Sequence, residues 1–299
     1  MRLVEKTHQM NAFYKYMTAD VAEIVLQNRT LRWSSPKLFN DPFDVPRELA
    51  VGVEKNEIRK ELASLILSFF RSSDKAPAGL SQKLQLLISA IQSTRKDGLI
   101  DLIEDDLTKM LEAESFSSSS LEVFNEYWKK ILDDMRILCL CESHETTSMW
   151  YHYADKYSGV VIQFFCDDNS DSPWRIAKPI EYTNENHLVS TAKGWASLLV
   201  LDHEPALLKS FDVSAHTKSE DWSYEKEWRI ASFKRPGEEG FFSDYGFDGK
   251  SIGNIYLGPL IENNMKSRIV DASKKHENAR VYNSEITVGR KILFHPEQG

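Results

Sequence analysis

Two carboxylates, Glu225 and Glu227, stand two residues apart where a polar segment runs into an apolar one. In a strand over residues 227–233, alternation puts Trp228 and Ile230 on one face and Glu227 and Arg229 on the other. The two acids repel each other unless cations or a substrate share their space. The pair therefore predicts either a solvated strand edge, compensated by Arg229 and Lys226, or a functional carboxylate pair.

A second polar stretch, residues 39–44, reads Phe-Asn-Asp-Pro-Phe-Asp. Asn40 and Asp41 favour a turn, because such side chains bond nearby backbone and the following proline restricts the chain. Phe39 and Phe43 are predicted to anchor this turn to the core. The turn is either purely structural or the rigid wall of a cleft that faces the carboxylate pair.

A third stretch, residues 147–155, is rich in aromatic side chains. Trp150 and Tyr153 lie three residues apart, so they share a face of the predicted short helix and are expected to pack inward. His152 and its aromatic neighbours are predicted to line a pocket for a flat ring. The alternative is a hydrogen-bonded histidine on a short helix.

Composition narrows the class of protein. The chain has 299 residues, of which 41% are hydrophobic and 27% charged, enough for a substantial core. Its net charge of -8 gives no bulk attraction to phosphate, so a nucleic-acid partner would need a local basic patch. The sequence shows no apolar run of membrane-span length and no signal peptide. The three cysteines are predicted to be small buried side chains in a reducing compartment, without the paired ligand sets of a metal site, so a cytoplasmic protein is expected.

The elements that must position these residues form an irregular series. Strands are predicted at 13–16, 31–34, 136–142, 159–166, 176–182, 226–233, 254–257 and 280–294, the last with a break near Gly289. Helices are predicted near 186–201, 203–212 and 260–276, and after Thr18 or Asp20 with Val21, Ile24 and Val25 as its apolar positions. Parallel βαβ units need regular alternation, so this order predicts an α+β fold with a mixed, mainly antiparallel sheet.

Residues 54–133 have a different pattern: four stretches with a stripe of apolar residues at helical spacing, separated by glycine, proline and serine residues. The stripes begin at Ile58, Leu84, Leu99 and Leu121. We expect a helical subdomain inserted into an α+β core made of residues 1–53 and 134–299. Leucine and isoleucine stripes are typical of a core, so no chemistry is assigned to this block.

Four motif blocks resemble those of a widespread bacterial family, catalogued as a domain of unknown function. The blocks are Tyr14-Lys15-Tyr16, the Phe-Asn-Asp-Pro-Phe-Asp segment at 39–44, Trp150 with Tyr153 ahead of Gly159, and Trp-x-Tyr-Glu-x-Glu-x-Arg at 222–229. The resemblance covers residues 13–50, 136–166 and 215–260 and omits the predicted insertion. Membership in such a family does not itself supply an activity.

The chain is also remotely similar to ADP-ribosyltransferases of the Arg/Ser/Glu type. Those enzymes carry a basic residue on an early strand, a Ser-Thr-Ser element on another strand and a late Glu-x-Glu. The matching elements here are Lys15, Trp33-Ser34-Ser35 and Glu225-Lys226-Glu227. The chain departs from the pattern by having lysine for arginine and Ser-Ser-Pro for the serine element. The resemblance implies an ADP-ribosyltransferase-like fold and NAD as a substrate.

This resemblance assigns roles to the residues singled out above. Glu227 is expected to stabilise the oxocarbenium-like centre formed when nicotinamide leaves, and Glu225 to position the acceptor nucleophile. Residues expected to bind NAD or to build its cleft are Lys15 at the phosphates, Ser34 at the neighbouring sugar, and Tyr14, Trp33, Asn40, Asp41, His152, Tyr153 and Arg229. Asn40 or Asp41 is expected to pair with Arg229 or Lys226 across the cleft. The acceptor would be a protein or a nucleic acid, as for a toxin or a phage-defence effector.

Two other functions stay open. In a non-catalytic module, the same cleft would sense a nucleotide or bind a partner through the helical insertion. A metal-dependent nuclease or hydrolase would instead gather carboxylates around Mg²⁺, from Asp41, Asp44, Glu225 and Glu227. No Gly-x-Gly-x-x-Gly follows a strand and no Walker P-loop is present, so neither of those nucleotide sites is predicted.

Overall fold

The computed structural model describes residues 5–48, 53–72, 82–94, 118–167, 172–185, 191–200, 203–289 and 291–297. The chain divides into a sheet unit and a helical unit. The sheet unit consists of Met1–Phe39, Asp134–Tyr182 and Lys218–Gly299, and the helical unit of Asn40–Asp133 and Thr183–Thr217. The helical unit thus draws on two chain segments, where the sequence predicted a single insertion at 54–133. No helix in the described ranges is long and apolar enough to span a bilayer.

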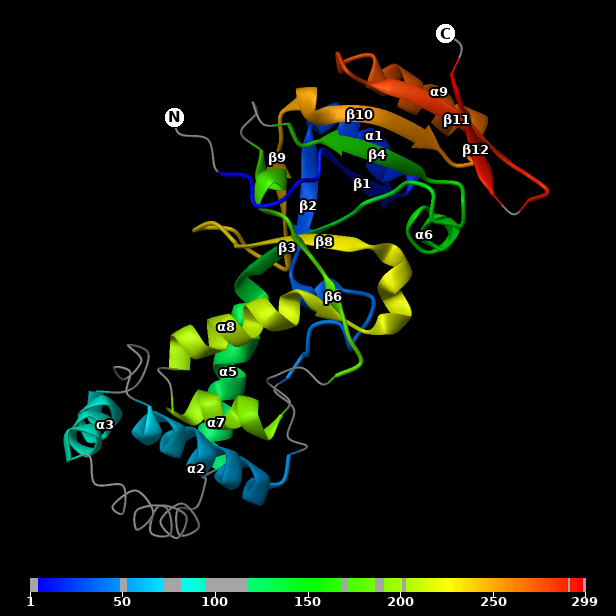
Figure 1. The fold of residues 1–299 in the computed structure, drawn as a ribbon. Coiled ribbons are helices and arrows are strands. Elements are labelled where there is room, and N and C mark those ends of the chain that lie inside the picture. The colour runs from blue at the N-terminus through cyan, green and yellow to red at the C-terminus, as the bar shows by residue number, and fades with distance from the viewer. Residues whose placement is uncertain are drawn as a thin grey trace. The chain divides into compact units, whose positions relative to one another are not determined.

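One ten-stranded sheet forms the centre of the sheet unit (Figure 1). Its strands are β1 (Ala12–Met17), β2 (Thr30–Ser34), β3 (Met135–Cys141), β4 (Val160–Phe165), β5 (Lys178–Pro179), β8 (Glu227–Phe233), β9 (Phe242–Gly246), β10 (Ile252–Leu257), β11 (Arg280–Ile286) and β12 (Ile292–Pro296). The main order is β12-β11-β10-β4-β1-β3-β2-β9, and β8 pairs with β3 and β5. The β10–β11 pair is parallel and the other described pairs are antiparallel, which confirms the predicted mixed, mainly antiparallel α+β sheet. Separately, β6 (Glu181–Tyr182) pairs with β7 (Thr217–Lys218).

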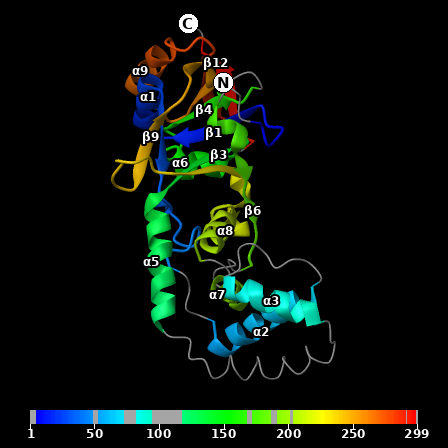
Figure 2. The same cartoon turned by 90° about the vertical axis from the view of Figure 1, so that its left-hand side faces the viewer.

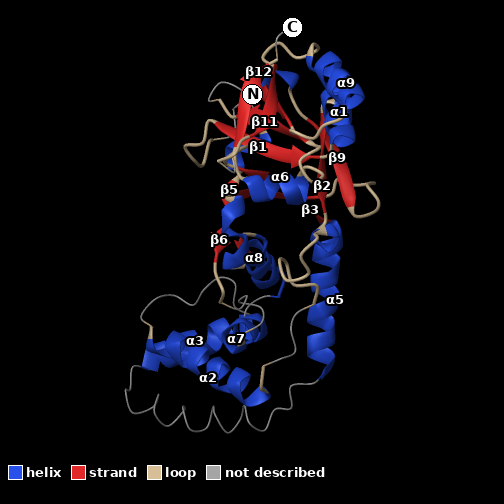
Figure 3. Cartoon of the chain, turned by 90° about the vertical axis from the view of Figure 1, so that its right-hand side faces the viewer, coloured by secondary structure: helices blue, strands red, loops and turns tan. Residues whose placement is uncertain are grey.

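Each face of the sheet is covered by helices, as Figure 3 shows. Helices α1 (Ala19–Asn28) and α9 (Asn263–Ser273) lie side by side and share the larger apolar core with Phe13 and Met17 of β1. The short helix α6 (Thr147–Tyr153) packs on the other face, where its Trp150 contacts Tyr16 of β1. Alternation along β1 therefore supplies both cores from one strand.

Helix α1 begins as predicted but buries a different face. The Thr18 hydroxyl accepts a hydrogen bond from the Val21 N–H at 3.4 Å, so the predicted cap is confirmed. Val21 and Ile24, two of the predicted apolar positions, are 45% and 53% exposed, so that part of the prediction is wrong. Val25, the third predicted position, is buried together with Leu26, because the helix rests on the sheet through that face and spacing alone did not distinguish the two faces.

The helical unit contains α2 (Lys55–Arg71), α3 (Gln82–Thr94), α5 (Ser118–Asp134, whose last residue belongs to the sheet unit), α7 (Ala192–Val200) and α8 (His203–Ala215). Helices α2 and α7 lie side by side (Figure 2). Trp128 of α5 is fully buried against Phe211 of α8, and its indole N–H donates to the Pro46 carbonyl at 2.8 Å. The predicted stripe that starts at Leu99 lies outside the described residues.

The turn at residues 39–44 closes locally rather than through two core anchors. The Asp41 carboxylate accepts a hydrogen bond from the Phe43 N–H at 2.8 Å, as expected for an Asx turn. The Phe43 side chain is 83% exposed, so its prediction as a core anchor is wrong. Asp44 is the buried residue of this turn, and Phe39 belongs to the sheet unit. Because the side chain of Asp41 holds the turn, a second aromatic anchor is not needed.

The structure differs from the predicted strands at two places. The predicted strand at 176–182 is a 3-10 turn (Pro173–Ile176) followed by the two-residue strands β5 and β6, consistent with a proline at 179. Strand β9 was not predicted, because Phe-Ser-Asp-Tyr-Gly contains no β-branched residue. It pairs with β2, and Arg32 reinforces the pair by an exposed ion pair with Asp244 at 3.0 Å.

Candidate functional site

The carboxylate pair is brought together by a short 3-10 helix, η4 (Glu220–Glu225), and the strand that follows it. The Ser219 hydroxyl caps η4 by accepting the Asp221 N–H at 3.4 Å. Lys226 then takes a left-handed conformation, with φ of 45°, which is uncommon for a residue other than glycine. This turn carries the chain directly from η4 into β8, so that Glu225 and Glu227 reach the same cation.

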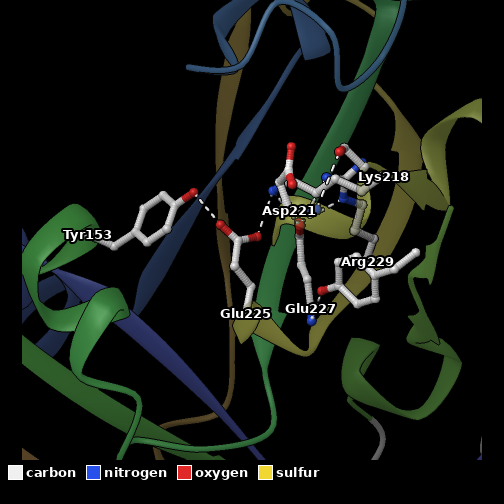
Figure 4. A network of polar contacts seen from close by, with 8 residues as sticks. Tyr153, Lys218, Asp221, Glu225, Glu227 and Arg229 are labelled. Carbon is white, nitrogen blue, oxygen red and sulfur yellow. Dashed lines mark hydrogen bonds and ion pairs between the residues drawn. The ribbon is translucent and has the colours of Figure 1, made fainter. Parts of the chain in front are cut away.

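That cation is Lys218 (Figure 4). Its ammonium donates to the Glu225 carboxylate at 2.6 Å and to the Glu227 carboxylate at 3.1 Å. Arg229 donates two hydrogen bonds to the Glu227 carboxylate, from Nε at 2.7 Å and from Nη2 at 3.0 Å. Two acids therefore share their space with two bases, the arrangement that their spacing required. The lysine that compensates them is Lys218, whereas the sequence pointed to the exposed Lys226.

All four charged side chains are buried. Lys218, Glu225, Glu227 and Arg229 are between 1% and 6% exposed. Charges this deep in a protein are tolerated only when they are paired and hydrogen-bonded. The alternation along β8 is as predicted, because Trp228 and Ile230 join the larger apolar core while the charged residues point to the other face.

The two carboxylates have different second partners. Glu225 accepts a hydrogen bond from the Tyr153 hydroxyl at 2.6 Å, and burial raises its pKa despite the attraction of Lys218. Burial also acts to raise the pKa of Glu227, but Arg229 and then Lys218 outweigh it and hold that pKa below its usual range. A hydrogen bond from the Cys139 thiol works in the same direction. Glu227 is thus kept ionised, while Glu225 holds its proton to higher pH.

Neighbouring strands support the cluster. The Tyr182 hydroxyl accepts the Glu227 N–H at 2.7 Å, and Cys139 of β3 is the register partner of Arg229. Burial, followed by the charge of Glu227, raises the pKa of the Cys139 thiol, so this side chain acts as a hydrogen-bond donor rather than as a nucleophile. Lys15 donates to the Cys139 carbonyl at 2.8 Å. The guanidinium of Arg229 lies 5.1 Å from the Phe39 ring.

An aromatic rim, made of His152, Trp222 and Tyr224, borders the cluster on its outer side. The Lys218 ammonium lies 4.9 Å from the Trp222 ring, which in turn makes edge contact with the His152 ring at 6.2 Å. The Tyr224 ring lies 6.1 Å from Trp222. His152 is exposed and Trp222 is half-buried. His152 of the 147–155 stretch therefore lies in this rim, next to Trp222.

The remaining predicted ligands lie elsewhere. Trp33 is buried in the larger core against Tyr245, on the face of the sheet opposite to the charged cluster. The Tyr14 hydroxyl accepts from the Gln163 amide at 3.1 Å, and Ser34 is paired within the sheet with Ile137 and Phe242. Among the contacts of the described residues, none joins these three side chains to the carboxylates. Asn40 and Asp41 belong to the helical unit.

Sequence reasoning missed Lys218, Tyr182 and Cys139. Lys218 opens the same polar stretch as the two glutamates, and that position was the one available signal. Tyr182 and Cys139 lie far from the pair in sequence and reach it only through strand pairing. Within the described ranges, no group of three or more His, Cys, Asp or Glu side chains is placed to hold a metal ion.

Fold and site together define an α+β protein with a buried carboxylate–cation cluster at the start of one strand. Residues 149–230 match the model of a family described as "Protein of unknown function (DUF2971)". The match runs from α6 through most of β8 and so includes the aromatic rim and the whole charged cluster, while the 39–44 turn lies outside it. This match supports the predicted resemblance to a family of unknown function. No curated protein and no solved structure matches the chain.

Proposed function

We propose that the chain is an NAD-dependent ADP-ribosyltransferase-like enzyme whose reaction centre is the pair Glu225 and Glu227. The observation that carries the proposal is the asymmetry of this pair. Both acids share Lys218, but Glu227 also accepts two hydrogen bonds from Arg229, whereas Glu225 accepts one from the neutral Tyr153 hydroxyl. Neighbouring acids whose pKa values are driven apart are typical of sites that need one fixed charge and one proton carrier.

Each acid has a role in such a reaction. When the glycosidic C–N bond of NAD breaks, nicotinamide leaves with the electron pair and an oxocarbenium-like centre remains. Glu227, ionised and held by Arg229, supplies fixed negative charge to that centre. Glu225 in its deprotonated form accepts the proton of the acceptor hydroxyl as the new C–O bond forms. Its raised pKa makes it a stronger base at neutral pH than an ordinary glutamate.

The substrate is proposed to reach the carboxylates through the aromatic rim. Both carboxylates are buried, so a substrate reaches them only when Trp222 and His152 separate. The Trp222 ring then offers a stacking surface for nicotinamide beside Lys218. Protein or nucleic acid is the proposed acceptor class, as for a toxin or a defence effector.

A non-catalytic nucleotide-sensing or partner-binding module is the second candidate. It is favoured by the mutual pairing of the four charges, since a buried cluster with matched ion pairs also serves to hold a fold in one arrangement. In that case the rim binds its partner and the carboxylates stay closed beneath it.

Nicotinamide release from NAD distinguishes the two candidates. We expect wild type to release nicotinamide, and Glu227→Gln to reduce the rate by about 100-fold or more, the usual loss for one preorganised electrostatic group. Glu225→Gln should reduce transfer to a cell-lysate acceptor more than NAD hydrolysis. Asp221→Asn, on the exposed surface of η4, is the matched control and should keep the wild-type rate.

The pH profile provides an independent reading of Glu225. Because its pKa is raised, the folded protein keeps this proton above the ordinary value of 4.5, and the base is inactive until the proton is lost. Transfer should therefore rise with pH above 4.5, and Glu225→Gln should abolish this rise. If wild type releases no nicotinamide at any pH, with or without lysate, the binding module is the correct reading.

A further inference from the structure

A pocket of about 290 Å³ borders the far end of β8 within the sheet unit. Its walls are largely aromatic, with an arginine at the edge, and include Trp33, Trp174, Phe233, Tyr245, Phe247 and Arg235. Glu227 and Phe233 are the first and last residues of β8, about 20 Å apart at about 3.3 Å per residue. Trp33 belongs to the core on the face of the sheet opposite to the charged cluster. The pocket is therefore separate from the carboxylate site.

One of the residues that line the pocket has a buried polar atom without a partner among the described residues. Trp174 is 1% exposed, and its indole N–H donates to no acceptor among the described residues. Two comparably buried tryptophans do have acceptors, because Trp150 donates to the His144 carbonyl at 2.7 Å and Trp128 to the Pro46 carbonyl. Buried donors are nearly always satisfied, so an exception points to an acceptor that is supplied from outside the chain.

A second hollow adjoins the first. It measures about 470 Å³ and shares Pro173, Gly246 and Phe247 with the aromatic pocket. Its own wall includes Ser172, whose hydroxyl oxygen is also buried without a partner in the described ranges, and Arg29. Asp248 lines it too, and its carboxylate already accepts the Lys250 N–H at 3.0 Å. The second hollow thus offers a cation and a hydroxyl donor next to an aromatic slot.

We propose that the two hollows together bind a planar heteroaromatic ring that carries an anionic group, the chemistry of a nucleoside monophosphate. The ring lies in the aromatic pocket, where a ring nitrogen or carbonyl accepts the Trp174 N–H. Arg235, whose guanidinium lies 4.5 Å from the Tyr245 ring, closes the edge of that pocket. The anionic group lies in the adjoining hollow, where Arg29 neutralises it and the Ser172 hydroxyl donates to it.

Gly246 makes a sharp test possible because it lines both hollows. A Cβ built at this position meets only the Arg29 carbonyl oxygen at 3.8 Å, an ordinary contact, so a side chain is tolerated. Gly246→Leu should fill the junction of the hollows while Gly246→Ala tests the smallest addition. Circular dichroism and the thermal midpoint without ligand confirm that each variant is folded.

Binding is measured by calorimetry on the full chain with 5′-AMP, adenosine and inorganic phosphate as probes. We expect 5′-AMP to bind more tightly than adenosine or phosphate, with at least a tenfold loss in Gly246→Leu and a several-fold loss in Trp174→Phe and Arg29→Gln. Trp222→Ala, on the rim of the carboxylate site, should leave this affinity unchanged and excludes binding there. The proposal is overturned if 5′-AMP does not bind, if Gly246→Leu and Trp174→Phe bind it as wild type does, or if phosphate alone binds equally well.

Discussion

The two ends of strand β8 treat buried polar groups differently. At the start of β8, the Glu227 carboxylate accepts hydrogen bonds from Lys218 and Arg229. At the end of β8, the pocket beside Phe233 is lined by Trp174, whose indole N–H has no acceptor among the described residues. Both regions bury polar groups against the same sheet. In the first region, neighbouring side chains of the chain itself satisfy these groups, and the protonation of Glu225 is the property expected to change with pH. The second leaves a donor for another molecule. Burial by itself therefore does not distinguish the two regions, whereas the partners of their buried polar groups do.

The largest effect should come from opening the closed cluster. Arg229→Met leaves Glu227 buried without its bidentate partner, and we expect a loss of about 3–5 kcal/mol in the free energy of unfolding. Urea denaturation followed by tryptophan fluorescence measures this loss. Arg32→Met is the matched control, since its ion pair with Asp244 is about half exposed and should be worth about 1 kcal/mol or less.

A double variant sharpens the same comparison. Glu227→Met combined with Arg229→Met removes both charges and should recover most of the stability lost in Arg229→Met, because no uncompensated charge remains. A single Arg229→Met variant as stable as wild type would contradict the assignment of this pair as a buried ion pair.

An intermediate effect is expected from two buried tryptophans, one whose indole N–H has an acceptor and one whose indole N–H has none among the described residues. Trp150→Phe leaves the His144 carbonyl without its donor, while Trp174→Phe removes a donor that has no acceptor in the described ranges. The first substitution should therefore cost more than the second by about 1–3 kcal/mol, the cost of an unsatisfied buried group. Equal losses in the two variants, measured by denaturation, would show that the Trp174 N–H is satisfied within the chain.

The smallest effect should come from the arginine at the open end of β8. Arg235 is exposed, and its contact with the Tyr245 ring is the kind that contributes about 0.5–1 kcal/mol at a surface. We expect Arg235→Met to change the free energy of unfolding by no more than this. A loss of stability as large as that of Arg229→Met would contradict the assignment of Arg235 to a weak surface contact.

Much of the sheet unit was predictable because strand alternation is a local property. Trp228 and Ile230 were placed on the apolar face and Glu227 with Arg229 on the other, and Thr18 was one of two residues, with Asp20, that could cap the first helix. The edge strand β9 was not, since its stability comes from pairing with β2 rather than from its own residues. Val21, Ile24 and Phe43 were wrongly predicted to be buried, because the apolar character of a residue does not show whether another part of the chain packs on it.

The sequence by itself determined that two acids two residues apart need cations beside them, and that one of those cations is Arg229 on the same strand face. Local spacing and Coulomb repulsion are sufficient for both conclusions. Only the tertiary structure decided that Lys218 bridges the pair, that Tyr153 completes Glu225, and that Trp33 packs against Tyr245 in the larger apolar core. These outcomes depend on the left-handed turn at Lys226 and on pairing between strands distant in the chain, and neither is encoded in the spacing of the residues they join.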